Sequence, residues 1–197
     1  DKITYLQKWC DTGFEVEQKK AAYTYDKAES KRNKILSKSL AIWPFAGYGR
    51  SKNRNPSEEW WSRLVSRLAD NSINVYHFGY FKEPNLSENK NLYHKLTDLD
   101  FFTQIKISLG AKVSLGTDSG SMWVLSAYAH PTITLLTNWS KNHNENFTAF
   151  LPINTNGVYI FKENGFKDLS IDEVYEECIK KGVSKVNQVN KFINKFR

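Results

Sequence analysis

The sequence predicts an α/β domain from about Ser39 to the C-terminus, with a doubly wound (Rossmann-like) parallel sheet and helices on both faces. Short apolar runs of strand length alternate with longer segments whose apolar residues recur at helical spacing, and the connections between them are short. This alternation is typical of parallel βαβ units with right-handed crossovers. With 197 residues, of which 40% are hydrophobic and 14% aromatic, the chain can bury a core of that size.

The expected strands are short apolar runs that end at glycine, proline or polar residues. They lie near Leu40, Val75, Val113, Ile133 and Tyr159. Between the second and third of these, the segment from Pro84 to about Lys95 is expected to be a polar loop.

The clearest expected helix follows the first strand. Asn55 suits its N-cap, Pro56 its first helical position, and Glu58 the capping box. The apolar residues that follow share one helical face: Trp60, Trp61, Leu64, Val65 and Leu68. Further helices are expected from Leu99 to Leu109, Ser121 to Tyr128 and Ile171 to Lys181, with a short one in the C-terminal tail.

Residues 1–38 are more highly charged than the rest and contain one glycine and no proline. We expect a charged helical arm or linker that packs outside the sheet, with its helix between Glu15 and Leu36. The second predicted domain, residues 39–197, is the sheet domain itself.

The formal charge of +7 fits a polyanionic partner or simply a basic composition. No recognisable nucleic-acid-binding motif accompanies the charge, which argues against nucleic acid as the partner. The two cysteines lack zinc-site spacing, so no metal is expected and a reducing compartment is the default. Because no apolar run approaches the ~20 residues of a membrane span, we expect a cytoplasmic protein, with the membrane surface as a further option.

Ligands of open parallel sheets bind at the carboxyl ends of the strands. After the first strand, Gly47 and Gly49 allow close backbone approach, while Arg50, Lys52 and Arg54 precede a helix N-terminus. Cations and free N–H groups together favour an anion such as phosphate. The alternative is a solvated basic loop.

Two further strand ends carry residues suited to a nucleotide. At Phe78–Glu83, aromatic rings can stack on a base and the Glu83 carboxylate can bind ribose hydroxyls, or the rings can belong to the core. At Gly116–Trp123, the turn at Ser119 and Gly120 exposes N–H groups that suit a diphosphate. Asp118 can instead cap the helix, and Met122 and Trp123 can be core residues.

The stretch Gly116 to Met122, followed by Leu125, Ala127, His130, Pro131 and Thr132, resembles the signature of family 9 glycosyltransferases, the lipopolysaccharide heptosyltransferases. Looser similarities are Arg54–Pro56 before Trp60, the Gly79–Glu83 segment, and Ile171–Tyr175, so the resemblance covers about Leu40 to Lys181. Trp123 stands where the family has His, and Asn55 where it has Trp.

The resemblance implies the C-terminal, donor-binding half of a GT-B glycosyltransferase that holds a nucleotide diphosphate sugar without a metal or other cofactor. The implied donor and phosphate residues are Gly47, Arg50, Lys52, Arg54, Asp118, Ser119, Gly120 and Met122. The implied nucleoside residues are Phe78, Gly79 and Glu83. Catalytic residues are not identified, because an N-terminal acceptor domain or a partner chain supplies them in this scheme. The alternative is a non-catalytic nucleotide-binding or assembly module with the same fold.

Overall fold

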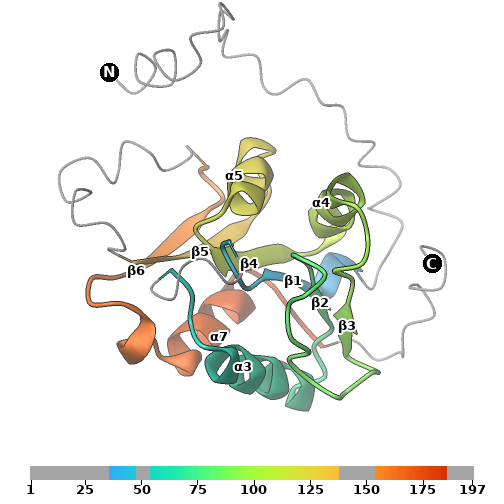
Figure 1. The fold of residues 1–197 in the computed structure, drawn as a ribbon, viewed down its shortest axis with the longest axis horizontal. Coiled ribbons are helices and arrows are strands. Elements are labelled where there is room, and N and C mark those ends of the chain that lie inside the picture. Colours follow the sequence, from blue (N-terminus) through green and yellow to red (C-terminus); the bar gives the residue numbers. More distant parts are fainter. Residues whose placement is uncertain (1–35, 48–53, 138–153, 186–197) are drawn as a thin grey trace, which may run out of the picture.

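The computed structural model describes residues 36–47, 54–137 and 154–185. Within them lies a parallel sheet of six strands in the order β3-β2-β1-β4-β5-β6 (Figure 1). The strands are β1 (Leu40–Trp43), β2 (Val75–His77), β3 (Tyr93–Lys95), β4 (Val113–Thr117), β5 (Thr132–Thr137) and β6 (Val158–Lys162). Every neighbouring pair is parallel, which confirms the predicted doubly wound sheet.

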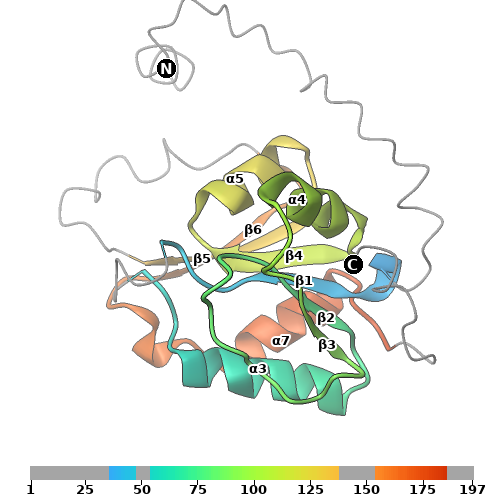
Figure 2. The same cartoon turned by 45° about the vertical axis from the view of Figure 1, so that its right-hand side comes forward.

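Helices cover both faces of the sheet (Figures 1 and 2). α3 (Glu58–Asp70) and α7 (Ile171–Lys180) lie on one face, and α4 (Phe101–Gly110) and α5 (Gly120–Ala127) on the other. Short 3₁₀ turns occur at η1 (Leu36–Lys38) and η2 (Phe166–Asp168). Each face therefore has its own core. Strand residues alternate between the two cores, so that Leu40 and Ile42 pack toward α3, whereas Ala41 and Trp43 pack toward α4 and α5.

The connection between β2 and α4 contains a strand where the sequence predicts only a polar loop. The prediction for Pro84 to Lys95 is wrong at its end, because Tyr93–Lys95 pairs in parallel with Val75–His77 as the edge strand β3. A strand of three residues that follows an asparagine-rich segment carries too little periodicity to be recognised. Tertiary pairing with β2 makes the strand.

The start of α3 also differs from the prediction. Ser57, not Asn55, is the N-cap, and its side chain accepts a hydrogen bond from the N–H of Trp60. Asn55 is engaged elsewhere, by backbone groups of Ala46. Glu58 becomes the first helical residue, so the predicted capping box does not form, although its charge still favours the helix N-terminus.

The ends of the chain are only partly described. Residues 1–35, which hold most of the predicted arm, and the predicted tail helix lie outside the described residues. Leu36, at the inner end of that arm, is buried in the core beside α4 and α5. Among the helices that the structure describes, none is long and apolar enough to cross a bilayer.

Candidate functional site

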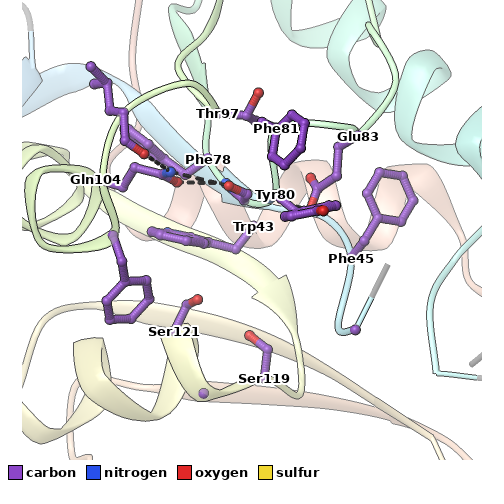
Figure 3. A pocket seen from close by; sticks show the side chains of 15 residues that line it. Trp43, Phe45, Phe78, Tyr80, Phe81, Glu83, Thr97, Gln104, Ser119 and Ser121 are labelled. Carbon is purple, nitrogen blue, oxygen red and sulfur yellow. Dashed lines mark hydrogen bonds between the residues drawn. The ribbon is translucent and has the colours of Figure 1, made fainter. Parts of the chain in front are cut away.

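A cavity of about 770 Å³ opens at the carboxyl edge of the sheet (Figure 3). It lies at the ends of β1, β2 and β4, where the strand order reverses between β1 and its neighbour β4. In open α/β sheets this reversal leaves a crevice because the connections leave toward opposite faces, and ligands bind there. Its lining comprises Trp43, Phe45, Gly47, Phe78, Gly79, Tyr80, Phe81, Glu83, Thr97, Leu99, Phe101, Gln104, Ser119, Gly120 and Ser121.

Aromatic rings form most of the apolar wall of this cavity. Trp43, at the end of β1, stacks on Phe78 with ring centroids 5.4 Å apart and meets Phe101 edge-on at 6.2 Å. The indole N–H of Trp43 donates to the Ser108 hydroxyl at 3.1 Å, which fixes the ring. Such a wall binds flat apolar or aromatic groups better than it binds isolated ions.

A turn from Gly79 to Glu83 forms the side of the cavity next to β2. Gly79 has φ of +144°, and the Gln104 side chain holds its backbone by accepting from its N–H at 2.8 Å and donating to its C=O at 3.2 Å. The Glu83 carboxylate accepts from the Tyr80 N–H at 2.8 Å. The turn exposes the rings of Tyr80 and Phe81, which are 48% and 58% accessible with centroids 4.5 Å apart.

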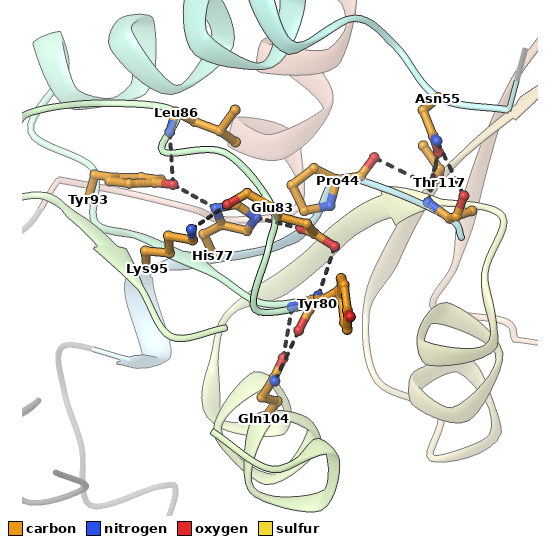
Figure 4. A network of polar contacts seen from close by, with 12 residues as sticks. Pro44, Asn55, His77, Tyr80, Glu83, Leu86, Tyr93, Lys95, Gln104 and Thr117 are labelled. Atoms are coloured by element: carbon orange, nitrogen blue, oxygen red, sulfur yellow. Dashed lines mark hydrogen bonds and ion pairs between the residues drawn. The ribbon is translucent and has the colours of Figure 1, made fainter. Parts of the chain in front are cut away.

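Behind this turn, buried polar groups form a continuous network (Figure 4). His77 Nε2 lies 2.8 Å from Glu83 Oε2, and His77 Nδ1 lies 2.6 Å from the Tyr93 hydroxyl. That hydroxyl accepts from the Leu86 N–H, so its own proton is free to go to Nδ1. His77 is then neutral and donates from Nε2 to the carboxylate. Burial lowers the pKa of His77, in keeping with the neutral ring.

The floor of the cavity is the first turn of α5. Ser119 is its N-cap, with extended backbone and a side chain that accepts from the N–H of Met122. Gly120 and Ser121 follow and line the cavity. The Met122 side chain points the other way, is 1% exposed, and sits where a Cβ on Gly116 would collide with its sulfur.

Arg54 and Asp118 lie together beside the floor. Arg54 Nη2 donates to the Asp118 carbonyl at 2.9 Å and lies 3.6 Å from the Asp118 carboxylate. The other carboxylate oxygen accepts from the indole N–H of Trp123 at 2.9 Å. Asp118 is therefore held from two sides, and its charge is balanced by a cation next to Ser119.

Asn55 joins the two ends of the segment from Gly47 to Arg54, which carries the predicted cations. Its Oδ1 accepts from the Ala46 N–H at 2.7 Å, and its amide donates to the Ala46 C=O at 3.3 Å. The Thr117 hydroxyl, at the end of β4, donates to the same Oδ1 at 3.2 Å. The two ends of the segment from Gly47 to Arg54 are thus fixed to each other and to the sheet.

The structure brings six of the sequence-predicted residues together in the cavity lining: Gly47, Phe78, Gly79, Glu83, Ser119 and Gly120. Arg54 and Asp118 stand beside the lining, and Met122 lies in the core behind it. Arg50 and Lys52 are outside the described residues. Glu83 lines the cavity with only 1% of its side chain exposed, because both carboxylate oxygens accept hydrogen bonds from within the protein.

Sequence reasoning missed several lining residues and the network behind them. Thr97, Leu99 and Gln104 reach the cavity only because β3 places the chain beside β2, and the strand went unrecognised. Trp43 ends an expected strand, and that position at a carboxyl edge could have marked it. No group of three or more His, Cys, Asp or Glu side chains within the described ranges is placed to hold a metal ion.

An open parallel sheet with a cavity at its strand-order reversal is the architecture of doubly wound α/β domains, which bind their ligands at that point. Among solved structures, the fold is similar to E. coli heptosyltransferase WaaC with ADP-2-deoxy-2-fluoro heptose, with 16% identity and a TM-score of 0.62 over 88% of this chain and 53% of that one. It is also similar to E. coli ADP-heptose LPS heptosyltransferase II, with 17% identity and a TM-score of 0.59 over 85% and 52%.

A family 9 glycosyltransferase from Veillonella parvula is similar as well, with 9% identity and a TM-score of 0.59 over 80% of this chain and 49% of that one. The resemblance to heptosyltransferases is thus confirmed at the level of the fold, and the chain spans about half the length of these enzymes. No protein-family model and no curated protein matches the sequence.

Proposed function

We propose that this chain is the donor-binding part of a glycosyltransferase, and that it holds a nucleoside diphosphate sugar while the catalytic groups come from elsewhere. The observation that carries the proposal is the place of the cavity, at the strand-order reversal of a sheet similar to that of heptosyltransferases. One of those structures contains ADP and another ADP-2-deoxy-2-fluoro heptose.

The chemistry of the lining divides between the two ends of such a ligand. The rings of Tyr80 and Phe81 offer faces on which a nucleobase can stack. The backbone at Ser119 and Gly120, the first turn of α5, suits the diphosphate because free N–H groups and the helix dipole favour an anion. We propose that no metal is needed, since Arg54 next to this turn supplies positive charge.

The Arg54–Asp118 pair favours the second candidate, a non-catalytic nucleotide-binding or assembly module. An arginine that is already bound to a carboxylate offers less charge to a phosphate than an unpaired one. Trp123, which stands at the family's histidine position, reinforces that arrangement by binding Asp118. Both candidates require nucleotide binding, and they differ in whether sugar transfer follows once the missing part is supplied.

Nucleotide binding can be measured directly by calorimetry and by thermal shift, with ADP, UDP, GDP and their sugars. A ligand present at about 100 times its dissociation constant adds about 2.7 kcal/mol of apparent stability. We expect at least one nucleoside diphosphate to bind, with the same affinity in EDTA as in Mg²⁺. If none stabilises the protein at millimolar concentration, the proposal is wrong.

Arg54→Ala tests the phosphate end. The substitution removes the cation and leaves the Asp118 carboxylate uncompensated beside the diphosphate. Loss of a charge-assisted contact costs roughly 1.5–3 kcal/mol, so we expect one to two decades of weaker nucleoside diphosphate binding. Arg67→Ala is the matched control, because Arg67 is also paired with an aspartate, Asp172, but lines a different pocket, between α3 and the start of α7. Equal weakening in both variants would mean a general charge effect.

A further inference from the structure

The Gly79–Glu83 turn is held far more firmly than an exposed turn requires. Its first residue is clasped at both backbone groups by Gln104 of α4. Its last residue is tied through its carbonyl to Lys95 of β3 and through its carboxylate to His77 of β2. Three separate elements therefore fix one five-residue turn.

The groups that hold the turn are buried and polar. His77 and the Glu83 side chain are fully or almost fully excluded from solvent, and Tyr93 is buried with them. Burying a carboxylate and an imidazole together contributes little net stability compared with apolar residues of similar size. A satisfied buried network does, however, specify a single conformation. The conformation that it specifies is that of the turn.

What the turn presents is a pair of exposed aromatic rings on the wall of the cavity. Tyr80 and Phe81 are among the most exposed large hydrophobic side chains of the described residues. The Tyr80 N–H is itself one end of the network, since it donates to Glu83 Oε1. From the Leu86 N–H, the contacts run through the Tyr93 hydroxyl, His77 and Glu83 to the backbone of Tyr80 (Figure 4).

We propose that Tyr93 and His77 are positioning residues, which fix the Glu83 carboxylate so that the turn presents Tyr80 and Phe81 to a bound base. This inference rests on the proposed nucleotide binding for its ligand, but the positioning itself can be tested without one. Neither residue lines the cavity. Both act through Glu83, whose carboxylate lies against His77 with only 1% of the side chain exposed.

In this proposal Glu83 holds the turn, whereas the sequence suggests a contact with ribose hydroxyls. The Glu83 carboxylate contacts His77 Nε2 through one oxygen and accepts from the Tyr80 N–H with the other, so both oxygens hold the turn. Specificity for a base then comes from how firmly the rings are placed, since a rigid platform loses less entropy on binding than a mobile one.

Tyr93→Phe is the sharpest variant because it removes only the hydroxyl that bridges Leu86 and His77. The matched control is Tyr175→Phe, on α7, where the ring packs under Arg67. Hydrogen exchange of the full chain is measured by NMR for individual amides. We expect the Gly79 and Tyr80 amides to exchange about tenfold faster in Tyr93→Phe, and the exchange rates of the amides in β1 and β4 to stay unchanged. We expect Tyr175→Phe to leave all of these amides unchanged.

His77 provides a second pair of variants. His77→Leu removes both ring nitrogens, and His77→Gln keeps an N–H donor for Glu83. We expect fast exchange at Tyr80 in the leucine variant and partial rescue in the glutamine variant. If His77→Leu does not fold, Tyr93→Phe still decides the question. Unchanged exchange in the turn, or faster exchange throughout the sheet, would show a merely structural role and overturn the inference.

Ligand binding separates this inference from the proposed function. With ADP as the probe, we expect Tyr93→Phe to weaken binding about tenfold, and Tyr175→Phe to leave it within twofold of the unsubstituted chain. If the turn loosens but ADP affinity stays the same, the positioning of the base is refuted. If the unsubstituted chain binds no nucleotide at all, the proposed function fails, while the exchange rates still decide whether Tyr93 and His77 hold the turn.

Discussion

At the scale of single residues, Asp118 shows how one side chain can belong to a site without facing the ligand. One oxygen of its carboxylate accepts a hydrogen bond from the indole N–H of Trp123, and the other forms an ion pair with Arg54. Trp123 belongs to α5, whose first turn is the floor of the cavity, and Arg54 lies beside that floor. The sequence leaves Asp118 open between a helix cap and a donor contact. In the structure Ser119 is the cap, and Asp118 fixes the cation.

His94 offers a prediction for pH dependence. It lies buried in β3, with Nε2 3.3 Å from Asn74 Oδ1, and burial lowers its pKa from 6.5 to about 4. Below about pH 6.5 the unfolded chain therefore takes up a proton that the folded chain refuses, and stability falls as the pH drops toward 4. The full shift corresponds to about 3 kcal/mol.

The substitution His94→Gln keeps a donor for Asn74 and removes the titration. We expect the free energy of unfolding to fall less between pH 7.5 and 4.5 in this variant than in the unsubstituted chain, by roughly 2–3 kcal/mol. Urea unfolding at the two pH values measures the difference. An identical pH dependence in both proteins would mean that His94 titrates normally in the folded state.

At the scale of elements, the Gly79–Glu83 turn depends on its glycine. Gly79 adopts φ of +144°, and a Cβ there would overlap both carboxylate oxygens of Glu83. Gly79→Ala should therefore displace Glu83 as well as strain the backbone. Such strain alone costs about 1–3 kcal/mol. Gly165→Ala is the control for strain, since Gly165 has φ of +88° but nothing within 4 Å of the added Cβ.

We expect Gly79→Ala to lower stability more than Gly165→Ala does, and to weaken ADP binding, which Gly165→Ala leaves intact. Differential scanning calorimetry and ADP titration of both variants provide the comparison. Equal losses of stability would mean that the carboxylate moves aside freely, and the turn would then be less tightly held than its contacts indicate.

The sequence predicts elements well where the apolar periodicity is strong, and poorly where a strand forms only because it pairs with a neighbouring strand. Five strands and the main helices follow from apolar runs and spacing, with ends shifted by at most two residues. Tyr93–Lys95 forms a strand only because it meets β2, and no local pattern shows this. The same strand places Tyr93 next to His77 and leads the chain to Thr97. Without the strand, neither the buried network nor this side of the cavity could be predicted from the sequence.

At the scale of the whole molecule, the order of the strands assembles the cavity from segments that are far apart in the sequence. Parallel strands bring three polar turns to one edge, and their residues meet in the cavity at the reversal between β1 and β4. The sequence predicts that the turns share an edge, because all of them follow strands of one parallel sheet. It does not predict the orientation of Met122 or Glu83, since side-chain direction depends on packing that only the folded structure settles.

The last prediction concerns catalysis by this chain alone. Sugar transfer needs a base for the acceptor hydroxyl, within hydrogen-bond reach of it. Among the described residues, Glu83 is the carboxylate that lines the cavity, and both of its oxygens are engaged with only 1% of the side chain exposed. Asp118, beside the cavity, forms an ion pair with Arg54 and accepts a hydrogen bond from the indole N–H of Trp123. Neither group is positioned to accept a proton, and the chain spans about half of the similar enzymes.

We therefore expect the isolated chain to bind a nucleoside diphosphate sugar without multiple turnover. The measurement is product formation by mass spectrometry, with several nucleotide sugars and glycan or lipid acceptors, at enzyme concentrations high enough to detect a single turnover. Arg54→Ala serves as the control, because residual transfer that depends on the site should fall with nucleotide affinity in this variant. Sustained turnover that Arg54→Ala abolishes would contradict the prediction, and would mean that the chain carries its own base in a segment beyond the described residues.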